Sequence, residues 1–146
     1  MTRARYLHPA AVPLPVREQV AGMIRFAVRA TGLDWLTPCL RVAWYVPIGG
    51  EGGEEPAAAF AMQAGAWGFV MRKDPTLIHL RADLLLDAIL LTAAHEIYHV
   101  AEYLHGISRE DEAGRQRSEA EAEAFARRAF LLLRGRGPVL CWRRRA

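Results

Sequence analysis

The segment TLIHLRADLLLDAILLTAAHEIYHV, residues 76–100, decides how this chain is expected to fold. Residues 76–80 form a short apolar run that predicts a strand. From Asp83, a fair N-cap residue, a nearly continuous apolar stretch predicts a long helix that ends near His105, where Gly106 can terminate it. This helix is apolar on almost every side, so we expect it to be central and buried.

The residues on either side predict a small sheet and two further helices. Before the central helix, the patterns predict a helix over 16–31 that stops at Gly32, a strand over 40–46, a glycine-rich loop over 48–56, a hairpin of 57–63 with 67–72, and a turn at 73–75. After it, a loop over 108–116 is expected. Ser118 and Glu121 fit a capping box for a helix over 118–133, which Gly135, Gly137 and Pro138 would end.

These elements predict one α+β domain spanning residues 1–146. It consists of an N-terminal helix, a small sheet of three or four strands, the long central helix and a C-terminal helix. Residues 1–15 are expected to be an irregular lead-in, and residues 135–146 a basic tail.

The composition is that of a globular protein, because 52% of the residues are hydrophobic. The N-terminus has no continuous apolar run, so we expect no signal peptide. Charged residues interrupt the central helix, which argues against a membrane span. Two cysteines far apart in sequence suit a reducing compartment, and we expect a cytoplasmic protein. Seven arginines follow Glu123 without an acid, but no nucleic-acid-binding motif accompanies them, so no nucleic-acid partner is expected.

The chemistry is expected at His95, Glu96 and His99, which form a His-Glu-x-x-His motif on the central helix. Residues four apart lie about 40° apart around a helix, so both imidazoles face the same way, as two ligands of one Zn²⁺ require. Glu96 lies beside them, where it can act as a general base on an activated water. Two core histidines and a surface glutamate are the less favoured alternative, because burying all three without a metal is costly.

A catalytic zinc site needs a third protein ligand. His105 has a suitable spacing, but the position between it and His99 that would need a turn-forming glycine is Glu102. On a continuous helix His105 therefore points away from His95. Glu119 opens the next helix, which a helical hairpin would fold back on the first. Glu119 is favoured as third ligand, with His105 and Glu123 as alternatives. Glu123 is otherwise expected to accept the second imidazole N–H of a ligand histidine.

Two features remain open at this stage. Peptide hydrolysis needs a group that stabilises the oxyanion, and Tyr98, Tyr103, His105 or an arginine could supply it. If residues 76–80 form an edge strand, an extended peptide could add to it. His79 in this strand is expected to be a core or surface residue rather than a ligand.

These motifs resemble the ImmA/IrrE metallopeptidase-like family. Residues 76–100 are similar to its strand and active-site helix with Ala-His-Glu-x-x-His, and EAEAEAFA at 119–126 matches its E-x-x-A-x-x-F-A pattern. The resemblance covers about residues 67–133. It implies a minimal gluzincin-like, zincin-type fold, Glu119 as the third zinc ligand, and action on transcriptional repressors. The family often has glycine where Tyr98 stands and asparagine where Glu123 stands.

We therefore expect a zinc metallopeptidase that hydrolyses a peptide bond in a protein or peptide substrate. Two other functions stay open. One is a regulatory binding module that keeps the zinc site and cleaves nothing. The other is a nucleic-acid-binding protein that uses the arginine-rich tail. The sequence does not predict the oligomeric state.

Overall fold

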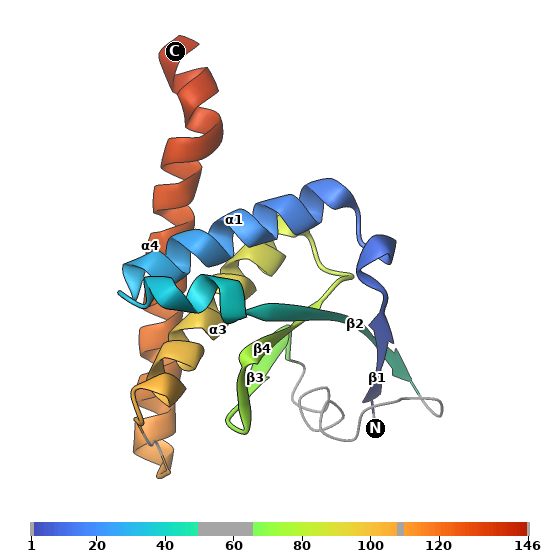
Figure 1. Ribbon diagram of the computed structural model, residues 1–146, viewed down its shortest axis with the longest axis vertical. Helices are drawn as coiled ribbons and strands as arrows, with labels where there is room; N and C mark the ends of the chain where they lie inside the picture. Colours follow the sequence, from blue (N-terminus) through green and yellow to red (C-terminus); the bar gives the residue numbers. More distant parts are fainter. Residues whose placement is uncertain (1, 50–65, 108–109, 146) are drawn as a thin grey trace.

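The computed structural model describes residues 2–49, 66–107 and 110–145, whose path is drawn in Figure 1. In chain order the elements are β1 (Thr2–Leu7), the 3₁₀ helix η1 (Pro9–Ala11), α1 (Leu14–Ala30), the 3₁₀ helix η2 (Asp34–Cys39), β2 (Arg41–Gly49), β3 (Gly68–Met71), β4 (Asp74–Arg81), α3 (Leu86–Leu104) and α4 (Glu112–Arg145).

The α+β class is confirmed, and the helices follow in the predicted order. The sheet has the strand order β1-β2-β4-β3, with β2 and β4 parallel and the outer strands antiparallel to them. The expectation of an irregular lead-in over residues 1–15 is wrong, because residues 2–7 form β1 along β2. The prolines that suggested irregular chain begin only at Pro9, and Ala4 before them is fully buried.

Strand β4 contains residues 76–80 and lies inside the sheet, between β2 and β3. The possibility that this segment forms the edge is therefore wrong, and the edge strands among the described residues are β1 and β3. The predicted hairpin partner 57–63 lies outside the described residues. Strand β3 pairs instead with β4 across a turn at Arg72 and Lys73. Pro75 is tolerated in β4 because the pairing with β2 begins only at Leu77.

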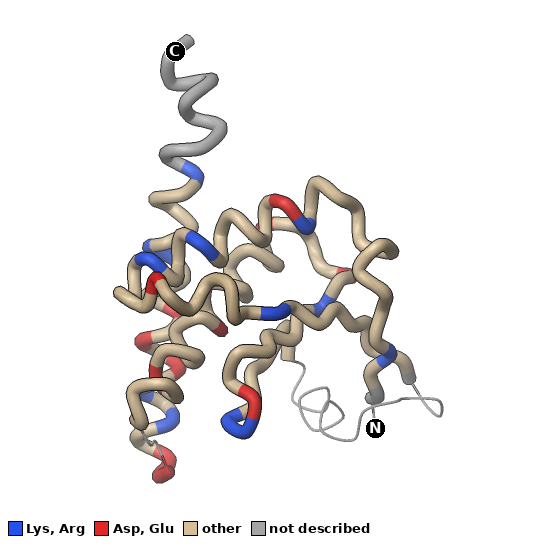
Figure 2. The backbone as a smooth tube through the Cα atoms, in the orientation of Figure 1, with Lys and Arg blue, Asp and Glu red and all other residues tan. Residues whose placement is uncertain are grey.

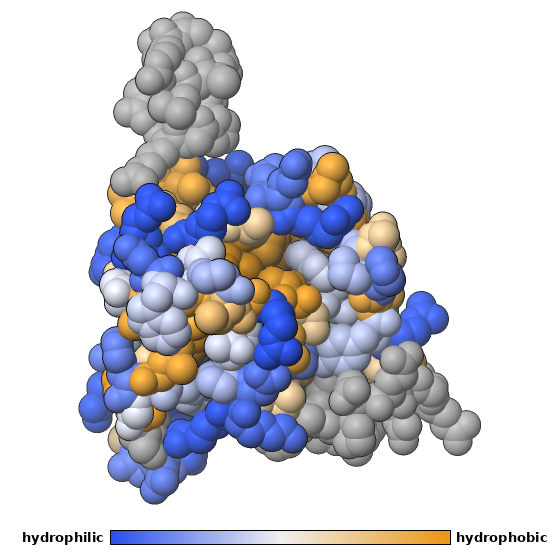
Figure 3. Space-filling view, in the orientation of Figure 1, coloured by the Kyte–Doolittle hydropathy of each residue, from blue (hydrophilic) through white to orange (hydrophobic). Residues whose placement is uncertain are grey.

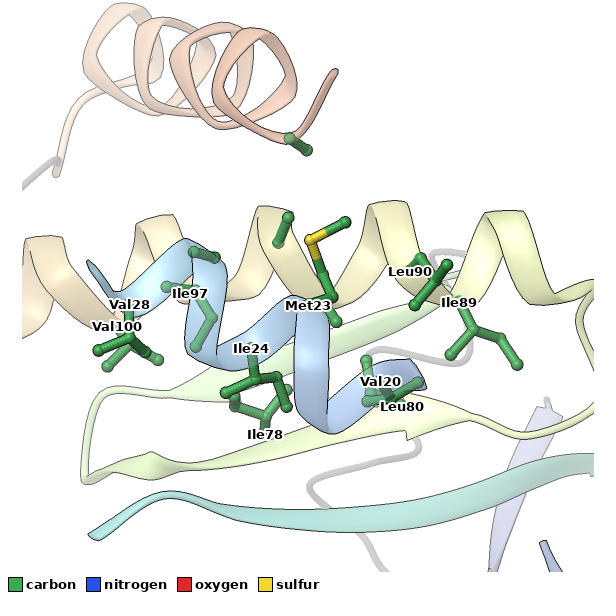
Figure 4. Packing of buried hydrophobic residues seen from close by; sticks show 14 of the residues in the cluster. Val20, Met23, Ile24, Val28, Ile78, Leu80, Ile89, Leu90, Ile97 and Val100 are labelled. Atoms are coloured by element: carbon green, nitrogen blue, oxygen red, sulfur yellow. The ribbon is translucent and has the colours of Figure 1, made fainter. Parts of the chain in front are cut away.

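Helix α3 is central, as predicted, because it contacts α1, α4, β3 and β4. It ends at Leu104, and Gly106 takes the left-handed conformation with φ of 71°. Asp83 does not cap it: this carboxylate pairs with the Arg81 guanidinium at 2.9 Å, and the helix begins three residues later. Figure 4 shows the core between α3, the sheet and α1, whose buried residues are Val20, Met23, Ile24, Ala27 and Val28. The predicted helix over 16–31 is thus confirmed.

Helix α4 begins earlier and ends later than predicted. The predicted capping box at Ser118 is wrong, because α4 already begins at Glu112. Asp111 is the N-cap residue, and its carboxylate accepts a hydrogen bond from the Gly114 N–H at 2.6 Å. The predicted end after residue 133 is also wrong, since the helix backbone continues to Arg145 and includes most of the expected tail 135–146. Arginine, a good helix former, lies on both sides of Gly135.

The surface of the described residues shows one apolar hollow on the face in Figure 3, between α1 and β2. It has a volume of about 380 Å³ and is lined by apolar side chains that include Ile24, Val42 and Trp44, with Arg17 and Arg25 at its margin. None of the helices in the described part of the chain combines the length and apolarity that crossing a bilayer requires.

On the sheet face away from α3, His79 is a buried core residue, with 5% of its surface exposed. Its Nδ1 lies 2.7 Å from the Tyr6 hydroxyl, and its ring stacks on Phe69 at 4.1 Å. Burial lowers the pKa of His79 to about 4, because the charged imidazolium loses its hydration.

This histidine should make the fold sensitive to acid. The pKa of His79 is near 6.5 in the unfolded chain, so between pH 6.5 and 4 this histidine is protonated in the unfolded chain and neutral in the folded one. The free energy of unfolding should therefore fall, by up to about 1.4 kcal/mol per pH unit, as the pH drops through that window. We expect His79→Phe to reduce this slope in urea titrations. His105→Gln, at an exposed histidine, serves as the control, and an equal slope in both variants would contradict the assignment.

Candidate metal centre

Helices α3 and α4 bring together one ligand atom each from His95, His99 and Glu119, all within 4.8 Å of one another. The two imidazole Nε2 atoms are 3.2 Å apart, and Glu119 oxygens lie 3.4 Å from His95 Nε2 and 2.5 Å from His99 Nε2. A tetrahedral Zn²⁺ with bonds of 2.0–2.1 Å holds its ligand atoms about 3.3 Å apart. The histidine–histidine and His95–Glu119 distances match that spacing.

Small residues let the two helices approach closely enough to complete this cluster. His95 and His99 are one turn apart on α3, and the helical hairpin places α4 beside them. The face of α4 that packs against the core carries alanines at every third or fourth position after Glu119: Ala122, Ala126 and Ala129, all buried. Short side chains at an interface allow two helices to pack with a small separation. Glu119, at the start of this stripe, therefore reaches the histidines.

Glu96 is buried, with 6% of its surface exposed, between the two histidine positions. Burial raises the pKa of its carboxyl to about 7, although the nearby His99 and His95 act in the opposite direction. A cation bound beside it would again favour the charged carboxylate. A carboxyl group in this position is suited to exchange protons with a water molecule.

Glu102 orients the second histidine. Its Oε1 lies 2.9 Å from His99 Nδ1 and accepts a hydrogen bond from the Ser118 hydroxyl at 2.6 Å. When Nδ1 carries the proton that Glu102 accepts, Nε2 faces Glu119 and His95, and its lone pair becomes available to a cation once Nε2 has lost its own proton. Burial lowers the pKa of His99, but hydrogen bonding to Glu119 and the other carboxylates outweighs this effect and raises it to about 9.

Glu123 pairs with Arg127 at 3.5 Å and lines the cavity beside His95. The carboxylate that contacts a ligand histidine, as was expected of Glu123, is that of Glu102. The reason is geometric, because Glu102 lies three residues after His99 and on the same face of α3. That spacing, on an otherwise apolar helix, is the signal in the sequence that could have identified it.

His105 lies away from the cluster, whereas the Tyr98 ring lies beside the His99 ring, with centroids 6.2 Å apart. His105 is the exposed C-cap residue of α3. The Tyr98 hydroxyl donates to Glu121 Oε1 at 2.7 Å, and its ring packs against Phe125. Neither lines the cavities beside the histidines. Among the candidates for an oxyanion-stabilising group, Tyr103 does line one of them, together with Arg72.

Two cavities meet at the cluster. One of about 420 Å³ contains Arg72 and Tyr103, and one of about 470 Å³ contains Trp67 and Leu91. Both are lined by Gly68, Glu96 and Glu119, so they adjoin at the cluster. Together they are called the groove, which lies between β3 and the helix pair.

Gly68 holds the edge strand close to α3. A Cβ atom at this position would lie 2.6 Å from the Thr92 methyl carbon and 2.7 Å from the carbonyl oxygen of His79. Both distances are too short for real atoms, and the second neighbour is backbone that cannot rotate away. Glycine is therefore required for β3 to approach the site this closely.

No family model, curated protein or solved structure matches the chain.

The contact between Glu102 and His99 predicts a measurable effect on metal binding. We expect Glu102→Gln to weaken Zn²⁺ binding about 10-fold or more, because outer partners of ligand histidines typically contribute 10- to 100-fold. Competition with a fluorescent chelator measures this affinity. Glu112→Gln, an exposed carboxylate on α4, is the matched control. Equal affinities in the two folded variants would show that Glu102 does not orient the ligand.

Proposed function

We propose that this protein is a zinc-dependent metallopeptidase that hydrolyses a peptide bond in a protein or peptide substrate. The observation that carries the proposal is the meeting of His95, His99 and Glu119 in the groove, with the buried Glu96 beside them. Binding sites for metals alone do not require a groove or an adjacent free carboxyl group, whereas hydrolysis requires both.

The donor set fits Zn²⁺. Two imidazole nitrogens and one carboxylate oxygen leave a fourth position open, as in catalytic zinc sites. Glu102 and Ser118 support this fit, because they hold His99 in the tautomer that a metal ligand needs. Zinc, when bound, lowers the pKa of water and polarises a carbonyl group.

The residues of the chain then supply proton transfer and alignment. Glu96 accepts the proton of the attacking water and returns it to the leaving amine, which is the task of a general base and acid. The groove holds the substrate beside β3, whose outer edge has no neighbouring strand among the described residues. An extended peptide can add to such an edge by main-chain hydrogen bonds. The strand that we expect to receive the peptide is thus β3 rather than β4.

The resemblance to the ImmA/IrrE family supports the same proposal. The residues that carry it, within about 67–133, are those that form β3, β4, α3 and the first half of α4 around the groove. Regulatory cleavage of a repressor protein in the cytoplasm is therefore the first substrate class to test.

The test combines metal analysis with a peptidase assay. We expect mass spectrometry of the purified protein to show about one zinc ion per chain. Zinc-loaded protein should cleave members of a peptide library, a chelator should stop cleavage, and added zinc should restore it. Protein that binds zinc and cleaves nothing would instead support the regulatory binding module. Protein that binds no metal would contradict the site itself.

A further inference from the structure

The two ends of the groove differ in charge. The end beside Trp67 and Leu91 adds one acid and one base, Glu123 and Arg127, which pair with each other. The other end contains two arginines, Arg72 and Arg115. In Figure 2 the turn between β3 and β4 carries basic residues, while acidic residues follow the first half of α4. A peptide that fills the groove therefore meets different chemistry on the two sides of the zinc ligands.

Of the two arginines, Arg115 already has an anionic partner. Its guanidinium pairs with the Glu112 carboxylate at 3.0 Å and donates to the carbonyl oxygen of Glu110. Arg72 is different: it is exposed and forms no ion pair within the described residues. The acid closest to it in sequence, Asp74, is held by Arg41 at 2.7 Å.

Arg72 is nevertheless held in place. Its guanidinium carbon lies 5.3 Å from the centre of the Tyr103 ring, and both residues line the same cavity. Stacking on an aromatic face limits the motion of the side chain without neutralising its charge. The acids that line this cavity do not compete for Arg72. Glu96 and Glu102 are buried, and Glu119 contacts the histidines.

We propose that Arg72 binds a carboxylate of the substrate, so that the protein selects peptides with an acidic residue, or a free C-terminus, at this end of the groove. This rests on the proposed function in that the groove must receive a peptide. The planar guanidinium is suited to a carboxylate because it can donate two parallel hydrogen bonds. From Gly68 to Arg72 is four residues, or about 13 Å of extended chain, so a decapeptide is long enough to reach from the zinc ligands to Arg72.

Binding to zinc-loaded Glu96→Gln protein tests this without any need for hydrolysis. The probes are fluorescein-labelled decapeptides of alanine and serine with one Glu, its position varied, and the matching Gln peptides, measured by anisotropy. We expect the best Glu peptide to bind roughly three- to tenfold more tightly than its Gln counterpart. This preference should become smaller at high salt, which screens the attraction between the two charges. Amidated and free C-termini distinguish a side-chain carboxylate from a terminal one.

Second substitutions in the same protein identify the group responsible. Arg72→Gln should abolish the preference, and Arg72→Lys should retain part of it. Lys73→Gln, which removes the neighbouring charge in the same turn, should leave it intact. The proposal is overturned if no peptide binds, if Glu and Gln peptides bind equally, or if the preference survives Arg72→Gln. Cleavage by the wild type is measured separately, so failure of the peptidase proposal leaves these binding results interpretable.

Discussion

Glu96→Gln should leave one zinc ion bound per chain and lower kcat/KM for peptide hydrolysis by roughly 10²- to 10⁴-fold, the usual contribution of a general base. The amide has nearly the shape of the carboxyl group, so the packing around this buried position is kept. It cannot accept the proton of the attacking water. Metal content and steady-state kinetics on the same preparation separate loss of chemistry from loss of the ion.

Glu121→Gln is the matched control for this experiment. Glu121 is an acid on α4 that contacts Tyr98 and lines neither cavity of the groove. We expect it to keep wild-type kinetics. If Glu96→Gln hydrolyses peptides as fast as this control, Glu96 is not the base and the mechanism proposed for the groove is wrong.

Glu119→Ala should remove the metal. It takes away one of three ligands, so we expect affinity for Zn²⁺ to fall by more than the 10- to 100-fold that follows loss of an outer partner. Purified protein should contain far less than one zinc ion per chain. Mass spectrometry gives the content, and titration against a chelator gives the affinity.

Glu123→Ala tests the specificity of that result. Glu123 is one turn further along α4, similarly exposed, and contacts Arg127 rather than the histidines. This variant should retain its zinc. Zinc retained by Glu119→Ala but lost by Glu123→Ala, or by His105→Ala, would transfer the role of third ligand to that residue.

Local patterns in the sequence predicted the helices that build the site. The periodicity of residues 16–31 and of the central helix specifies α1 and α3, and Gly32 and Gly106 have the positive φ values expected where these helices stop. The meeting of His95 with His99 follows from one helical turn, and the meeting with Glu119 from one short connection. These contacts depend on few residues close in sequence, which is why a pattern can suggest them.

The features that sequence reasoning missed depend on contacts between distant segments. The interior place of β4 is set by its parallel pairing with β2, which lies more than 30 residues away. The hydrogen bond from Ser118 of α4 to Glu102 joins two helices. The rotation of α4 against α3 also decides that Glu123 contacts Arg127 rather than a ligand histidine, and no single segment encodes that rotation. In α4 the N-cap residue is Asp111, seven residues before the capping-box pattern at Ser118.

The tight contact at Gly68 makes the stability of the fold and the width of the groove depend on the same residue. Any side chain there must first push β3 away from Thr92, and the same displacement widens the passage where a substrate would lie. Selecting variants only for folding and selecting them only for turnover should therefore remove the same substitutions of Gly68. A change of preference toward wider or narrower substrates would then require substitutions elsewhere in the groove, such as at the aromatic and arginine residues at its two ends.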